Sequence, residues 1–433
     1  MSARNRELLA LVPASLLLTA GFAAIFVQQS AELSDVSLTY GAAFLGLCLC
    51  AHVVIRATLP YADPYLFPLV AVLACFGLVV IYRLDETLAR EQAQWFVVGL
   101  VLFAATIVFL RDFRVLERYR YTVAAAGLLL LLLPRVPGLG QPVNGAYLGV
   151  GIGPISFQPA EFGKIAIVIF LAAYLRDTRQ ILVQGSRRIA GVTIPPLKHF
   201  GPLLVVWGGA MVMLVFIRDL GSSLMFFGGF LALLYVATNR LSFVAMGLGL
   251  FAVGAWFFAN TVGHIQNRID TWRDPFDRVL YEKPGGSYQI AQSLFAQADG
   301  GLFGTGFGQA LIAQPNGSPI LPAPQTDLIY AVITNELGLA GACGLLLVYL
   351  MVVERGFKIA MLARDSFSKL LATGLTAVFA LQVFVIVGGV TKVIPLTGVT
   401  LPFVSYGGSS IVANFVLLAL LLLISDRARR PAR

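Results

Sequence analysis

The chain has 433 residues, of which 58% are hydrophobic and 12% are charged, whereas soluble domains carry about 25% charged residues. This composition excludes a soluble globular protein and predicts a polytopic membrane protein. Lysine and arginine outnumber aspartate and glutamate by 31 to 22, so the net charge is +9. Whether a positive net charge indicates nucleic-acid binding depends on where the lysines and arginines lie along the chain.

Twelve apolar runs are candidates to cross a bilayer, which takes roughly 17–25 residues in a helix. They lie at residues 8–28, 38–58, 65–84, 94–111, 119–134, 160–176, 199–217, 220–238, 241–260, 327–353, 366–390 and 408–425. The division at Arg218 and Asp219 is the weakest of them. The predicted fold is therefore all-α, with about 12 transmembrane helices and one long polar loop at 261–326.

The positive-inside rule orients these spans. With both termini and alternate loops in the cytoplasm, 21 of the 31 lysines and arginines lie on that side. The loop 261–326 then faces outward, and no cleavable signal peptide is expected. Topology and attraction to anionic headgroups explain the positive charge, so we expect no nucleic-acid partner.

The first spans contain few polar residues. The four cysteines lie inside apolar runs, where a thiol acts as a small hydrophobe, so we expect no disulfide and no zinc site.

His52 is interpreted as structural, because no carboxylate is expected beside it. Between the third and fourth spans, Arg90 is either a solvated loop charge or a contact for an anionic ligand.

The outward loop 135–159 is rich in glycine and proline and leads into QPAEFGK. Gln158 and Pro159 suit a helix start, because proline is tolerated in the first turn. Glu161 and Lys164 then share one helix face as an ion pair. The pair either neutralises itself at the membrane boundary or holds the lysine ready for a phosphate.

Arg218 and Asp219 separate two apolar segments and precede Gly221, Ser222 and Ser223. This pattern is typical of a broken helix that lines a cavity. Alternatively, Asp219 caps the following helix.

The long insert mixes aromatics with both charge signs, as expected at a membrane surface. Residues 288–298 predict an amphipathic helix, with Ala291, Leu294, Phe295 and Ala298 on its apolar face, lying flat on the bilayer. The glycine run 300–309 resembles a nucleotide loop, but no strand precedes it, so that interpretation is set aside.

Asp327 lies at the outer mouth of the tenth span, where an ionised group loses solvation. It is therefore the candidate chemical centre, with a helix N-cap as the alternative. Glu336 lies nine residues further on, roughly 13 Å along a helix, and is interpreted as a buried partner between helices.

The last outward loop, TKVIPLTGVTLPFVSYGGSS, contains two prolines, three glycines and six serines or threonines, Ser405 among them. It also contains Tyr406 and one cation, Lys392. It predicts a re-entrant hairpin that lines a polar cavity.

Five stretches together resemble the SEDS family (RodA, FtsW and SpoVE), over about Leu66 to Asp426. They are FQPAEFGK, RDLGSS, SYQIAQSLFA with GGLFGTGFG, LPAPQTDLIYAVITNELG, and IPLTGVTLPFVSYGGSS. One departure is that many relatives carry Arg-Arg-Trp where this chain has Ala146 and Tyr147.

The resemblance implies a ten-helix core at 65–426, two additional N-terminal helices within 1–64, as in longer RodA-like members of actinobacteria, and a basic cytoplasmic tail at 427–433. It implies a peptidoglycan glycosyltransferase that polymerises lipid II outside the cytoplasmic membrane. The implied partners are a class B penicillin-binding protein and elongasome or divisome membrane proteins. Asp327 matches the catalytic aspartate of the family, and Glu161 and Lys164 match its paired residues.

Glycosyl transfer from a lipid diphosphate needs a base or a metal-holding carboxylate, and cations for the leaving diphosphate. Asp327 is predicted for the first role and Lys164, Arg90, Lys392 and Arg218 for the second. A divalent cation, Mg²⁺ or Mn²⁺, shared between Asp327 and the diphosphate is the expected cofactor, with no organic cofactor. Two alternatives stay open: a flippase for lipid-linked precursors, and a non-catalytic scaffold that activates a partner synthase.

Overall fold

The computed structural model describes residues 3–30, 35–143, 146–152, 155–184, 187–189, 192–194, 208, 220–313 and 320–431. Within these ranges, eight helices are long and apolar enough to cross a membrane. They belong to α1 (Ala3–Ser30), α2 (Asp35–Thr58), α3 (Leu66–Leu84), α4 (Glu86–Phe109), α9 (Leu220–Thr238), α14 (Ile329–Leu362), α15 (Ser366–Val390) and α16 (Gly408–Arg429). The predicted class, an all-α polytopic membrane protein, is confirmed.

Three further predicted spans are helices that do not meet the same length and hydropathy requirement. They are α6 (Arg120–Leu132), α7 (Ala160–Gln184) and α10 (Leu241–Thr261). α6 has only 13 residues, and the apolar part of α10 ends at Phe257. The predicted span 199–217, with Arg218 and Asp219, lies outside the described residues, so the number of twelve stays a prediction.

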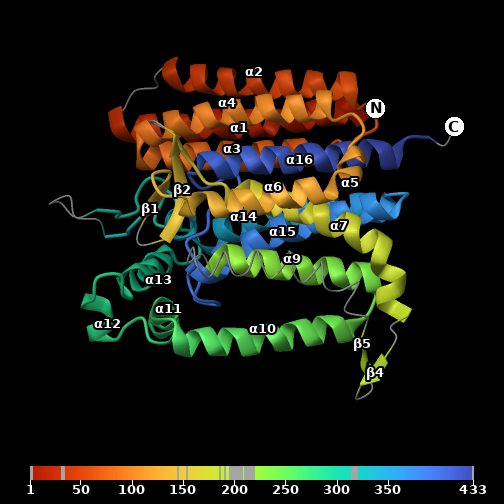
Figure 1. The fold of residues 1–433 in the computed structure, drawn as a ribbon. Coiled ribbons are helices and arrows are strands. Elements are labelled where there is room, and N and C mark those ends of the chain that lie inside the picture. Colours follow the sequence, from red (N-terminus) through yellow and green to blue (C-terminus); the bar gives the residue numbers. More distant parts are fainter. Residues whose placement is uncertain are drawn as a thin grey trace.

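The long helices form one bundle with different structures at its two ends. Figure 1 shows both chain termini at one end, and α11 (Gly263–Arg273), α12 (Arg278–Glu282) and α13 (Tyr288–Gly300) at the other. α16 packs against α4, α7, α14 and α15. α15 also contacts α7, α9 and α14, so α15 and α16 occupy the centre of the bundle.

The two N-terminal helices pack at one edge of this bundle, α1 against α3 and α2 against α4 (Figure 1). Their interior contains a polar contact that was not expected. His52 Nδ1 lies 2.8 Å from Glu7 Oε1, and Arg4 contacts both Glu7 and the carbonyl oxygen of Ala62. The expectation that no carboxylate pairs with His52 was therefore wrong, because the partner comes from a helix distant in sequence.

α4 begins earlier than the predicted span at 94–111. Asp85 is its N-cap and accepts hydrogen bonds from the N–H groups of Thr87 and Leu88. The following residues, ETLAREQAQ, are mostly good helix formers. The segment expected to be a loop is thus the first part of the helix, which places Glu91 and Gln92 on α4.

The loop 135–159 contains a small antiparallel sheet, which was not predicted. After α5 (Val115–Arg118), α6 and the 3₁₀ turn η1 (Leu133–Arg135), the strands are β1 (Gly140–Val143), β2 (Ala146–Ile152) and β3 (Ile155–Phe157), in the order β1-β2-β3. Val150 pairs with both Gly140 and Phe157. A two-stranded hairpin, β4 (Arg187–Ile189) and β5 (Val192–Ile194), follows α7.

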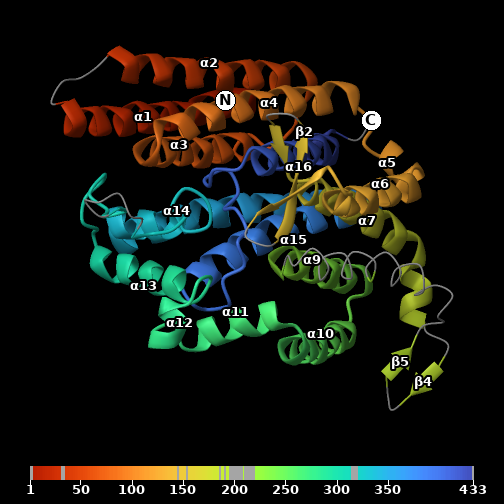
Figure 2. The same cartoon turned by 60° about the vertical axis from the view of Figure 1, so that its left-hand side comes forward.

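α13 matches the predicted amphipathic helix, but its buried side differs from the predicted face. Ile290, Ala291 and Ser293 are buried, while Phe295 is 46% exposed. α13 packs against α14 (Figure 2). Protein therefore covers a different side of the helix, while Phe295 and Ala298 of the predicted apolar face are exposed.

α14 is broken at Gly338, whose φ of 66° and ψ of −172° are not helical. The glycine run supplies the hydrogen bonds lost there. Thr305 N–H donates to the carbonyl oxygen of Asn335 at 2.9 Å, and Leu339 N–H donates to that of Gly301 at 3.0 Å. The run 300–308 is thus a backbone partner of α14, which explains its composition without a nucleotide.

We predict that Gly338→Ala lowers the unfolding temperature in detergent, whereas Gly344→Ala does not. A Cβ at Gly338 would lie 2.3 Å from the Gly304 nitrogen, in a backbone region whose strain costs about 1–3 kcal/mol. At Gly344, in the same helix, a Cβ meets nothing within 4 Å. Equal unfolding temperatures for the two variants would contradict the packing described above.

Candidate functional site

The candidate site lies at the end of the bundle where α14 and α16 begin and α15 ends. Two non-helical segments meet there, the residues before α14 (321–328) and the hairpin between α15 and α16 (391–407, below called the hairpin). Both were predicted to be polar and non-helical. Their mutual hydrogen bonds determine where Asp327 lies.

Asp327 is half-buried and lies immediately before Leu328 and α14. The N-cap position of α14 is Leu328, one residue after Asp327. A capping role for Asp327 therefore stays an alternative hypothesis. A Cβ placed on Gly398, which has a φ of +73°, would lie 3.3 Å from Asp327 Oδ2, so the carboxylate lies against the backbone of the hairpin.

Ser405 and Tyr406 attach the hairpin to the segment that carries Asp327. Ser405 Oγ donates to the carbonyl oxygen of Thr326 at 2.8 Å, and Tyr406 N–H donates to that of Gln325 at 2.8 Å. Ser405 Oγ also accepts from Leu401 N–H at 2.9 Å. Both residues were predicted to bind substrate, and in this structure their visible contacts position the loop of Asp327.

The first turns of α4 add a contact that sequence reasoning missed. Gln92 is buried; its Nε2 donates to the carbonyl oxygen of Ser405 at 3.2 Å, and its Oε1 accepts from Gly407 N–H at 3.1 Å. The Tyr406 hydroxyl donates to Glu91, and burial together with this hydrogen bond raises the pKa of Tyr406. The run of good helix formers at residues 86–94 could have indicated that Glu91 and Gln92 belong to a helix.

Glu161 and Lys164 form a buried pair, as the sequence predicted. Lys164 Nζ lies 2.5 Å from Glu161 Oε2 and 2.6 Å from Gln382 Oε1 of α15. The side chains of Lys164 and Glu161 are 3% and 6% exposed. Gln382 Nε2 in turn donates to the carbonyl oxygen of Thr400 at 2.9 Å, so the pair connects α7 through α15 to the hairpin.

Gln158 and Pro159 lie immediately before α7, which confirms the predicted helix start at Ala160. Gln158 N–H donates to Ser409 Oγ of α16 at 2.8 Å. Ser410, which follows Ser409 in α16, accepts a hydrogen bond through its Oγ from Thr400 Oγ1 at 2.8 Å. α7 and the hairpin are thus both attached to the first turn of α16.

Two other predicted cations, Arg90 and Lys392, contact Glu86 and Trp272 among the described residues. Arg90 is 68% exposed and pairs with Glu86 at 2.6 Å. Lys392 has a φ of 62°, and its carbonyl oxygen accepts from Trp272 Nε1 at 3.1 Å. Arg268 donates to the carbonyl oxygen of Leu396, so α11 holds the hairpin. Arg218 and Asp219 lie outside the described residues, and their predicted roles are untested.

Glu336 belongs to a separate contact between helices, as predicted. Arg83 Nε of α3 lies 2.9 Å from Glu336 Oε1, and both side chains are largely buried. Arg83 also donates to the carbonyl oxygens of Gly308 and Ala310. This pair therefore fixes the glycine run against α3 and α14.

We predict that replacing Lys164 with Met lowers stability more than the double replacement Glu161→Gln with Lys164→Met. Removing one partner of a buried ion pair costs about 3–5 kcal/mol, because the other charge is left without compensation. Thermal unfolding of the single and double variants in detergent measures the coupling. Additive effects of the two substitutions would contradict a coupled pair.

The sequence of the chain is similar to a family model and to named proteins. A family model described as cell cycle protein, for FtsW, RodA and SpoVE, matches residues 64–430. Peptidoglycan glycosyltransferase RodA of Mycobacterium tuberculosis (strain H37Rv) is 43% identical over 99% of this chain and 92% of that protein. Stage V sporulation protein E of Bacillus subtilis is 32% identical over 80% of this chain and 90% of that protein.

Two solved structures extend the likeness to the fold. Rod shape determining protein RodA of Thermus thermophilus has a TM-score of 0.60 and 26% identity, over 86% of this chain and 98% of that one. A chain of a peptidoglycan synthase complex has a TM-score of 0.66 and 26% identity, over 86% of this chain and 99% of that one. The chain belongs to the FtsW, RodA and SpoVE family.

Proposed function

We propose that the chain is a peptidoglycan glycosyltransferase that polymerises lipid II into glycan strands, with Asp327 as its catalytic carboxylate. The observation that carries this proposal is the placement of Asp327. It is the half-buried carboxylate where the segment 321–328 meets the hairpin, and it lies against Gly398. The whole-length similarity to proteins named peptidoglycan glycosyltransferase RodA supports the same activity.

The proposed chemistry assigns Asp327 to the acceptor sugar. A carboxylate beside the acceptor hydroxyl takes its proton as the oxygen attacks the anomeric carbon of the donor. The bond from that carbon to the lipid diphosphate breaks, and the diphosphate leaves with the electron pair. Cations that face the leaving group stabilise its charge in the transition state.

Lys164 acts in this proposal as a positioning residue. Its ammonium group is occupied by Glu161 and Gln382 and is almost fully buried. Gln382 holds Thr400 of the hairpin, so the pair controls the conformation of the loop against which Asp327 lies. Direct contact of Lys164 with the diphosphate stays a prediction, as do the substrate contacts predicted for Arg90, Lys392 and Arg218.

A divalent cation fits a site of this kind. Within the described ranges no cluster of three or more His, Cys, Asp or Glu residues could enclose a metal ion. Mg²⁺ commonly binds through one or two carboxylates, with substrate phosphates and water as further ligands. Asp327 would hold the ion, which would neutralise charge on the diphosphate.

We further propose that the end of the bundle with Asp327 faces outward, that both termini are cytoplasmic, and that a class B penicillin-binding protein is the partner. The distribution of lysine and arginine supports this orientation. The likeness to a chain of a peptidoglycan synthase complex that coordinates polymerization and crosslinking supports a crosslinking partner.

We predict that Asp327→Asn abolishes glycan polymerisation, because the amide cannot accept the proton. The assay uses purified lipid II and the detergent-solubilised protein with its co-expressed partner. Asp299→Asn is the matched control, because Asp299 is an exposed residue of α13. If the Asp327 variant is folded and partner-bound but polymerises as well as wild type, the flippase and scaffold hypotheses become the better accounts.

The orientation has its own test. We predict that a membrane-impermeant thiol reagent labels Val279→Cys in intact spheroplasts, but labels Val115→Cys only after lysis. These positions are 76% and 47% exposed and belong to α12 and α5, at opposite ends of the bundle. The reverse labelling pattern would place Asp327 on the cytoplasmic side.

A further inference from the structure

A cavity of about 650 Å³ lies at the end of the bundle opposite Asp327. It is formed by the residue after α2, the connection between α4 and α5, the corner between α14 and α15, and the end of α16. α15 begins beside this cavity and ends beside the hairpin. Its 25 residues span roughly 37 Å as a helix, so the cavity is distinct from the candidate catalytic site.

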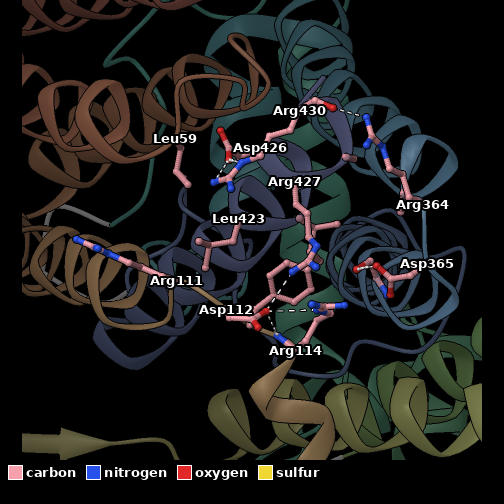
Figure 3. A pocket seen from close by; sticks show the side chains of 15 residues that line it. Leu59, Arg111, Asp112, Arg114, Arg364, Asp365, Leu423, Asp426, Arg427 and Arg430 are labelled. Carbon is pink, nitrogen blue, oxygen red and sulfur yellow. Dashed lines mark hydrogen bonds and ion pairs between the residues drawn. The ribbon is translucent and has the colours of Figure 1, made fainter. Parts of the chain in front are cut away.

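The cavity has a surplus of positive charge. Five arginines and three aspartates line it: Arg111, Arg114, Arg364, Arg427 and Arg430, with Asp112, Asp365 and Asp426. Figure 3 shows the side chain of Arg111 extending away from those of Arg114, Arg427 and Arg430. Without Arg111, the four remaining arginines still exceed the three aspartates by one positive charge.

Each of the three carboxylates already has a partner. Asp112 Oδ1 lies 3.1 Å from Arg427 Nη1 and 3.4 Å from Arg114 Nε. Asp426 Oδ2 pairs with Arg430 at 2.8 Å. Asp365 is the N-cap of α15 and accepts from Ser368 N–H at 2.9 Å.

Arg364 has no carboxylate partner within the described part of the chain. Its guanidinium donates to the carbonyl oxygen of Arg430 (Figure 3). Arg427 lies over the Phe113 ring, 6.0 Å from its centroid, and gives one donor to Asp112. Since a guanidinium has five N–H donors, both arginines keep donors for a further acceptor.

The surroundings favour an anion. Burial would raise the pKa of Asp112, but the hydrogen bond from Arg114 N–H and the charges of Arg114 and Arg427 lower it overall. Phe113, Leu423 and Ile424 are buried and form an apolar floor, which strengthens electrostatic attraction by lowering the local dielectric constant. Guanidinium forks match the geometry of phosphate oxygens.

We infer that this cavity binds a phosphate group, carried either by the headgroup of an anionic membrane lipid or by a soluble diphosphate. Arg364 and Arg427 are its principal donors, assisted by Arg430. Basic pockets between helices at a membrane boundary are typical sites for anionic headgroups. The inference goes beyond the proposed glycosyl transfer and stands without it, because no residue of the Asp327 site lines the cavity.

Two binding experiments on the purified full-length chain distinguish the sources. In the first, nanodiscs contain phosphatidylglycerol and phosphatidylcholine, and native mass spectrometry counts the retained lipids. In the second, nanodiscs contain phosphatidylcholine alone, and calorimetry measures the binding of inorganic diphosphate. The test variant is Arg364→Gln with Arg427→Gln. The charge-matched control is Arg6→Gln with Arg179→Gln, because both arginines are exposed and neither lines the cavity.

We expect the test variant to lose about tenfold or more in apparent affinity, as for the loss of a charge-assisted hydrogen bond, and the control to bind as wild type does. A loss in the first experiment identifies a lipid headgroup, and a loss in the second identifies a soluble phosphate. Should the double variant fail to fold, Arg364→Gln alone serves, because its guanidinium has no carboxylate partner. Equal binding by wild type and test variant in both experiments, or an equal loss in the control, overturns the inference.

Discussion

The structure depends on one constraint: backbone groups that leave a helix within a membrane protein need hydrogen-bond partners from the protein itself. α14 loses its helical hydrogen bonds at Gly338, and the run 300–308 replaces them. The segment before α14 receives its hydrogen bonds from Ser405 and Tyr406 of the hairpin. The non-helical segments therefore gather at one end of the bundle, because each satisfies another. Asp327 is placed by this arrangement and not by a helix.

Buried polar side chains also connect the hairpin to the helices of the bundle. Lys164 of α7 and Gln382 of α15 connect to the hairpin, and Gln92 of α4 holds it from the other side. A buried charge is tolerated only when it is paired and hydrogen-bonded, which explains why Glu161 accompanies Lys164. The opposite end of the bundle differs in its chemistry, since its arginines exceed its carboxylates and remain partly exposed. The two ends are thus suited to different ligands, with α15 extending between them.

Much of this fold could be predicted from sequence, because apolar runs and helix-starting residues are local signals. The helix starts at Ala160 and Ser366 and the polar character of the hairpin are examples. Contacts between distant residues could not be predicted in the same way. Glu7 with His52, Arg83 with Glu336, and Gln92 with Ser405 each join segments far apart in the chain. The early start of α4 was missed because its charged first turns suggested a loop, although Asp85 provides a cap. Asp327 could be identified as a candidate, whereas its position against Gly398 required the structure.

The most direct test of the central claim is a cryo-electron microscopy map of the chain bound to a non-hydrolysable lipid diphosphate disaccharide. The account predicts sugar density beside Asp327, between the segment 321–328 and the hairpin, with the lipid diphosphate adjoining it. Density at a place remote from Asp327, with the hairpin unoccupied, would contradict the assignment of this site as the catalytic centre.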